Sequence, residues 1–121
     1  MPTAWDHAAA LERLDGDELL LLELISVFFE EYPKLAARLT QSLSQNDFAG
    51  LREAAHSLKG SLAYLGAAEG ETLALALEQA SLSKDSALTG ELVAQLMAYI
   101  EAFRQLMVSS AGEPYDATRM Q

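Results

Sequence analysis

The chain contains no cysteine, and this absence removes several kinds of site at once. A disulfide framework, a thiol nucleophile and a cysteine-based zinc site are all excluded. Only two histidines are present, which further disfavours a metal centre built from nitrogen and sulfur ligands. Half of the residues are hydrophobic, so the chain has enough material for one core without a metal or a disulfide.

Long hydrophobic runs are missing as well. The longest apolar stretch, around residues 19–29, is interrupted by Glu23 and Ser26 and is too short to span a bilayer. The start of the chain lacks the basic and apolar regions of a signal peptide. We therefore expect a cytoplasmic protein that is not embedded in a membrane.

Basic residues are scarce, with eight Lys and Arg against eighteen Asp and Glu, and the formal net charge is −10. A protein that binds nucleic acid needs a basic face against the phosphates, so nucleic acid is not an expected partner. An anionic membrane surface is disfavoured for the same reason. The excess of negative charge keeps copies of the chain apart, which favours a monomer.

No stretch alternates β-branched and aromatic residues with polar ones, so no β-strand is expected. Ala, Leu, Glu and Gln are abundant, and all four are good helix formers. Turn-forming pairs such as Asp15-Gly16 and Asn46-Asp47 separate the helical stretches. The predicted helices cover residues 3–14, 18–44, 48–65, 68–82 and 86–108.

Four long helices with short connections predict an all-α fold, namely an antiparallel up-down-up-down four-helix bundle with a short additional N-terminal helix. We expect a single domain over residues 1–110 and a flexible C-terminal tail over residues 111–121. Pro33 lies inside the second predicted helix, where a proline removes one backbone hydrogen bond. The apolar pattern continues in phase beyond Pro33, so we expect one kinked helix rather than two.

The first half of that helix, LLLLELISVFF, has more large apolar residues than one buried stripe needs. Some of these side chains should be exposed, and an exposed apolar patch commonly marks an interface. The pattern leaves open which of Leu20, Leu21, Phe28 and Phe29 are exposed.

The third predicted helix has one clear buried face. Its apolar residues repeat at the spacing of a seam between packed helices. These residues are Leu51, Ala55, Leu58, Leu62 and Leu65.

A different face of the same helix carries His56, Lys59, Gly60 and Ala63, with Arg52 beside them, at about 100° of rotation per residue. A glycine inside a helix costs about 1 kcal/mol relative to alanine. Gly60 therefore indicates clearance for something bulky that approaches His56. Lys59 lies within reach of whatever the imidazole carries, which suits an anionic group.

The segment AHSLKGSLAYLGA, residues 55–67, resembles the signature of histidine-containing phosphotransfer domains. That family has an Ala-His pair, a Leu-Lys-Gly triplet, a small residue and a later Leu-Gly pair, and all of them stand here in the same order and spacing. The resemblance extends over residues 11–80 and includes the Leu77-Glu78 pair. Two positions depart from the family pattern: Gly70 replaces a usual leucine, and Tyr64 is unusually large.

The resemblance implies a phosphorelay intermediate, which accepts a phosphoryl group from an aspartate of one receiver domain and passes it to another in two-component signal transduction. By position, His56 is the phosphoacceptor through its Nε2 atom, Lys59 stabilises charge on the transferred group, and Gly60 gives clearance. Glu78 would orient the imidazole through the other ring nitrogen, with Gln79 as the alternative. Arg52, Ala63 and Tyr64 would surround the site where the partner docks, and we expect Tyr64 beside the site rather than over it.

The implied partners are receiver domains of response regulators and of hybrid histidine kinases. Magnesium is expected in the partner receiver, and this chain would have no cofactor of its own. It would be a phosphoryl carrier rather than an enzyme.

Two other functions compete with this interpretation. The same bundle could be a non-phosphorylated docking adaptor or an inhibitor of a sensor kinase or response regulator, although such a module has no need of His56 and Lys59. A hydrolase with His56 as general base would need a nucleophile, and Ser57 lies about 100° away around the helix. His7 has no motif around it and is expected at the surface, whereas Trp5 could serve docking or cover one end of the core.

Overall fold

The computed structural model describes residues 5–107, and the regular secondary structure of this part of the chain is all helix, with no strand. The elements follow the predicted order. They are α1 (His7–Arg13), α2 (Glu18–Ser44), α3 (Phe48–Tyr64), α4 (Ala68–Leu82) and α5 (Ser86–Met107).

Aspartate side chains begin four of these helices. Asp6, Asp17, Asp47 and Asp85 each accept a hydrogen bond from the backbone N–H three residues further along, at 2.8–3.0 Å. Such a contact satisfies one of the N–H groups that have no partner in the first helical turn. The predicted breaks are therefore confirmed as caps.

The predicted first helix, residues 3–14, is too long at its start. Helix α1 begins at His7 because Asp6 occupies the N-cap position in a non-helical conformation. The other boundaries agree within one residue, since Leu65 caps α3 and Met107 is the last described residue of α5. The predicted tail, residues 111–121, lies outside the described residues.

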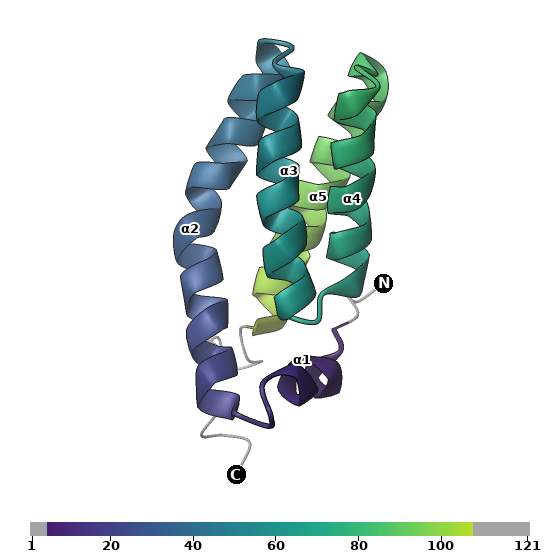
Figure 1. Cartoon of the computed structure of the whole chain (residues 1–121). Coiled ribbons are helices and arrows are strands. Elements are labelled where there is room, and N and C mark those ends of the chain that lie inside the picture. The colour runs from purple at the N-terminus through teal and green to yellow at the C-terminus, as the bar shows by residue number, and fades with distance from the viewer. Residues whose placement is uncertain (1–4, 108–121) are drawn as a thin grey trace.

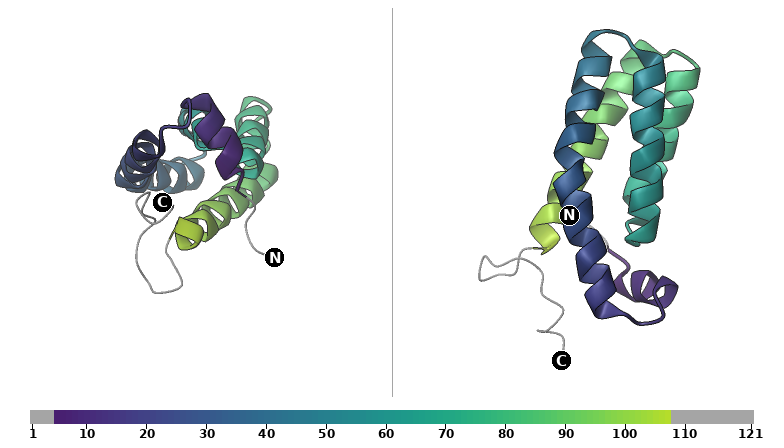
Figure 2. Two further views of the ribbon diagram at one scale, coloured as in Figure 1. Left: turned by 90° about the horizontal axis from the view of Figure 1, so that it is seen from below. Right: turned by 60° about the vertical axis from the view of Figure 1, so that its left-hand side comes forward.

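Helices α2, α3, α4 and α5 run side by side as an antiparallel bundle (Figure 1). Helix α3 packs against α2 and α4, α4 packs against α5, and α5 returns to contact α2. Helix α1 lies across one end of this bundle, as the view from below in Figure 2 shows. None of the described helices is long and apolar enough to cross a membrane.

Helix α1 and the residues before it hold the end of α3. The indole N–H of Trp5 donates to the carbonyl of Leu65 at 2.5 Å, and the Arg13 guanidinium donates to the carbonyl of Ala63 at 2.8 Å. Carbonyls at a helix C-terminus lack intrahelical partners, so these contacts stabilise the end of α3. Trp5 also packs edge-on against Phe103, with ring centroids 5.8 Å apart, which favours its role in covering the core.

His7 does not behave as the surface residue that the sequence suggested. Its side chain is only 24% exposed, and its Nε2 lies 2.7 Å from a carboxylate oxygen of Glu18 on α2. Its ring stacks on Trp5 at 4.8 Å between centroids. The prediction was wrong because His7 belongs to the contacts that attach α1 to the bundle.

The predicted seam of α3 is confirmed as core. Its five apolar residues are at most 2% exposed: Leu51, Ala55, Leu58, Leu62 and Leu65. Gly70, the departure in α4, also has a packing reason, since a Cβ there would lie 2.5 Å from the ring of Tyr99. A leucine at position 70 would therefore need Tyr99 on α5 to move.

Helix α2 continues through Pro33 as a single helix, as predicted, and Figure 1 shows it curving along its length. The structure also answers which of its apolar residues are exposed. Leu21 and Phe28 are buried, whereas Leu20 is exposed. Phe29 is partly buried against the core, with the Arg104 guanidinium 4.6 Å from its ring centroid.

Candidate functional site

Helix α3 turns His56 away from the core. Because its seam is buried between the neighbouring helices, the residues on its other face point outward, and the His56 side chain is 68% exposed. Asp47 fixes the start of the helix, and α1 holds its end. The imidazole is thus exposed on a helix that is restrained at both ends.

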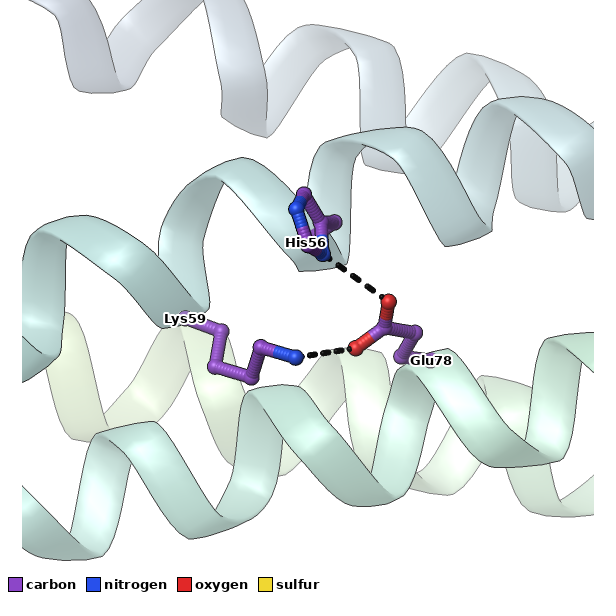
Figure 3. A network of polar contacts seen from close by, with 3 residues as sticks. All are labelled: His56, Lys59 and Glu78. Carbon is purple, nitrogen blue, oxygen red and sulfur yellow. Dashed lines mark hydrogen bonds and ion pairs between the residues drawn. The ribbon is translucent and has the colours of Figure 1, made fainter.

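Glu78 of α4 reaches across to this imidazole and holds two groups at once (Figure 3). One carboxylate oxygen, Oε2, lies 3.0 Å from His56 Nδ1. The other, Oε1, accepts a hydrogen bond from Lys59 Nζ at 2.8 Å. The predicted contact between Glu78 and His56 is present, whereas Gln79, the alternative, is exposed to solvent.

This contact determines which ring nitrogen of His56 is available. An ionised carboxylate can only accept hydrogen bonds, so a neutral imidazole must carry its proton on Nδ1 to donate to Glu78. Its Nε2 atom then has a free lone pair. The arrangement orients the ring so that the basic, nucleophilic nitrogen is the one that is not in contact with α4.

Glu78 stays ionised in this setting. The hydrogen bond from the Lys59 ammonium lowers the pKa of the Glu78 carboxyl below its ordinary value, and the hydrogen bond from His56 acts in the same direction. Partial burial works against this shift, since the Glu78 side chain is 16% exposed, but it does not reverse it. The carboxylate can therefore hold the ring from neutral to mildly acidic pH.

The surface one turn after His56 is open. Gly60 is exposed, and a Cβ placed on it would meet no atom within 4 Å. Ala63 is half-buried and adds only a methyl group. No packing contact requires the glycine, so the structure fits the interpretation that position 60 leaves room for an approaching partner.

Comparison with known protein families agrees with this site. A family model described as the Hpt domain matches residues 23–106, which is more than half of the chain. The chain belongs to the Hpt domain family. Hpt domains are phosphocarrier modules, so the protein has a phosphotransfer role in two-component signalling and interacts with receiver domains. Neither a search of curated proteins nor one of solved structures found a match.

The candidate site of this Hpt domain includes an open depression beside the imidazole. It is lined by Arg52, Glu53, His56, Ser57 and Glu78. Sequence reasoning missed Glu53, which pairs with Arg38 of α2. Its partner depends on the register between α2 and α3, and no local signal in the sequence reports that register.

A second feature of the Hpt domain lies between α2 and α3. An apolar groove there is lined by Leu24, Val27, Phe28, Glu31, Leu35, Ser61, Tyr64 and Leu65. Tyr64 is 62% exposed and lies two turns after His56, which places it about 12 Å further along the helix axis. At this separation Tyr64 does not cover the imidazole, and its role in docking stays a prediction.

Sequence reasoning also missed that Lys59 is already paired. Its side chain is 28% exposed and contacts the same carboxylate that orients His56. Within residues 5–107, no group of three or more potential metal ligands of the His, Asp or Glu type lies close enough to hold an ion. The imidazole and the ammonium of Lys59 thus share one bridging carboxylate, that of Glu78.

Proposed function

We propose that this Hpt domain is a phosphorelay intermediate. It accepts a phosphoryl group from a receiver-domain aspartate onto His56 Nε2 and passes it to the aspartate of another receiver. The observation that carries the proposal is the exposed imidazole whose Nδ1 is held by Glu78, because this contact leaves Nε2 free and directed away from the bundle.

The transfer step conserves atoms and charge. The Nε2 lone pair attacks the phosphorus of the aspartyl phosphate, and a nitrogen–phosphorus bond forms while the phosphorus–oxygen bond to the aspartate breaks. The electron pair of that bond goes to the released aspartate carboxylate. Nδ1 keeps its proton, so the positive charge that develops on the ring faces the Glu78 carboxylate at 3.0 Å.

The return step is the same reaction in reverse. A carboxylate oxygen of the second receiver attacks the phosphorus, the nitrogen–phosphorus bond breaks, and its electron pair returns to Nε2. Magnesium belongs in the receiver, where it would neutralise charge on the phosphoryl oxygens. Lys59 supports the step by holding Glu78, at 2.8 Å, in the position that orients the ring.

The groove between α2 and α3 is the surface on which we place the receiver. Its exposed members include Val27, at 48% exposure, and Tyr64, at 62%. Exposed apolar residues gathered in one groove are typical of a binding surface. Because the groove and His56 share α3, a partner seated in the groove could reach the imidazole across the open surface at Gly60.

The test uses the full chain and a panel of receiver domains charged with radiolabelled phosphoryl groups. Wild type, His56→Gln and the matched control His7→Gln are each mixed with every receiver. We expect acid-labile, alkali-stable label on wild type and on His7→Gln, and none on His56→Gln, since the control loses the other histidine in the same way.

Two results would contradict the proposal. Label that persists on His56→Gln would mean that another residue is the acceptor. If receivers bind the wild type but none labels it, the non-phosphorylated docking adaptor becomes the better description.

A further inference from the structure

Within the described residues, some charged side chains beside His56 form ion pairs with a neighbour, and one does not. In the depression around the imidazole, Glu78 is paired with Lys59 and His56, and Glu53 is paired with Arg38. Both carboxylates of the depression therefore already have cationic partners. The positive charge of Lys59 is offset before any phosphoryl group arrives.

Arg52 is the exception. It lines the same depression and is exposed, yet among residues 5–107 no carboxylate forms an ion pair with it and no acceptor takes a hydrogen bond from it. Its guanidinium is thus the one cation of the depression, within this described part of the chain, whose charge is not matched by a neighbour. An exposed, unpaired guanidinium next to a nucleophilic ring is available to an anion.

Helix geometry brings the two side chains together. Arg52 precedes His56 by four residues, so their Cβ atoms lie about 5–6 Å apart on adjacent turns of α3. Side chains on an α-helix lean toward its N-terminus, which tilts the His56 ring over the turn that carries Arg52. Lys59, in contrast, lies on the following turn and is drawn toward α4 by Glu78.

We propose that Arg52 binds the phosphoryl group carried by His56, with its guanidinium on the phosphoryl oxygens, while Lys59 remains paired with Glu78. This inference rests on the proposed function, because it requires a phosphoryl group on Nε2. The group brings a charge of about −1.5 to −2 at neutral pH and three acceptor oxygens. A guanidinium offers parallel N–H donors that fit two such oxygens, which an ammonium does not.

The test isolates Arg52 from partner docking. The full chain is phosphorylated with phosphoramidate, a small donor that needs no receiver, and the phosphohistidine is titrated by phosphorus NMR. In wild type, Arg52 lowers the second pKa of the phosphoryl group because it stabilises the dianion. Arg52→Gln should raise that pKa, and Arg52→Lys should restore part of the shift through its charge.

Two matched variants make the result decisive. Arg104→Gln loses the same charge on α5, where Arg104 is paired with Glu101. The phosphoryl group of this variant should titrate with the wild-type pKa. If instead Lys59→Gln raises the phosphoryl pKa and Arg52→Gln does not, Lys59 leaves Glu78 for the phosphoryl group and the inference is wrong. Failure of phosphoramidate to label His56 would also overturn it.

A second readout uses the transfer equilibrium with a receiver that labels the wild type. Loss of Arg52 should shift this equilibrium toward the phosphorylated receiver by about two- to fivefold, the effect of one exposed charge pair. An unchanged equilibrium would contradict the inference. If no receiver labels the wild type, the proposed function fails, whereas the phosphoramidate titration still reports on Arg52 alone.

Discussion

The two sides of α3 differ in chemistry. Toward α4, a polar network holds the imidazole, with Glu78 bridging His56 and Lys59 at 3.0 and 2.8 Å. Toward α2, the same helix borders an apolar groove in which Val27 and Tyr64 are exposed. One side supplies oriented, charged groups, and the other supplies apolar surface with few polar atoms.

This difference suits the proposed function, in which the reaction takes place on the side of α3 that faces α4 and the receiver binds on the side that faces α2. The seam of α3 is buried, so neither side can shift without disturbing the core. If the receiver docks in the groove, as proposed, side chains there can change the choice of partner while the ring of His56 keeps its orientation. We expect variants on the α4 side to alter reactivity toward any donor, and variants on the α2 side to alter reactivity toward receivers only.

The largest effect should come from Glu78→Ala. Without the carboxylate, the ring loses the acceptor that fixes its tautomer, and Lys59 loses its partner. Carboxylates that orient a metal-bound histidine are typically worth about 10- to 100-fold in metal affinity or activity, and we expect a similar factor here. Phosphorylation by receivers and by phosphoramidate should both slow by this factor, as measured by the initial rate of labelling. If the labelling rate fell with receivers but not with phosphoramidate, Glu78 would contribute to docking of the receiver instead.

The next effect should come from Val27→Asp, on the other side of α3. A charge in the apolar groove opposes burial against a receiver, and we expect about tenfold weaker binding. The rate with phosphoramidate should stay at the wild-type value, since Glu78 and His56 are untouched. Leu19→Asp is the matched control, because Leu19 is 66% exposed and lies outside the groove. If both variants weakened binding to the receiver equally, the groove would not be part of the interface.

Substitutions at Gly60 should affect stability and phosphoryl transfer in different ways. A Cβ at this position meets no other atom, so Gly60→Ala should stabilise the helix by about 1 kcal/mol. If the glycine provides clearance, Gly60→Gln should slow transfer from receivers while the protein remains folded. Urea unfolding reports the first effect and labelling rates the second. A glutamine variant with wild-type transfer would show that clearance is not needed there.

Most of the fold could be predicted from the sequence because its signals are local. Asp17 and Asp47 stand where caps are needed, and Leu51 and Leu58 repeat at helical spacing. The predicted start of α1 was too early. The sequence does not show that Asp6 is the N-cap, so the pattern alone could not place the first helical residue at His7. His56 and Glu78 followed from the family motif rather than from periodicity.

What could not be predicted depends on contacts between helices. The pairing of Lys59 with Glu78, and of Arg38 with Glu53, requires the register of neighbouring helices. The exposure of Leu20 against the burial of Leu21 depends on the rotation of α2 about its axis. The close approach of Tyr99 to Gly70 likewise arises only when α4 and α5 are packed. None of these is encoded within one helical segment.

The smallest predicted effect concerns pH and tests whether the network contributes to stability as well as reactivity. Lys59 lowers the pKa of Glu78 below its ordinary value of 4.5, so the folded state binds a proton there less readily than the unfolded chain. The resulting stability is fully present above pH 4.5 and is lost as the pH falls through the lower folded value. Wild type should therefore exceed Glu78→Gln by roughly 0.5–1 kcal/mol near neutral pH. The difference should shrink in acid, as urea unfolding at several pH values would show, whereas a difference that grows in acid would mean that the carboxylate is not stabilised by Lys59.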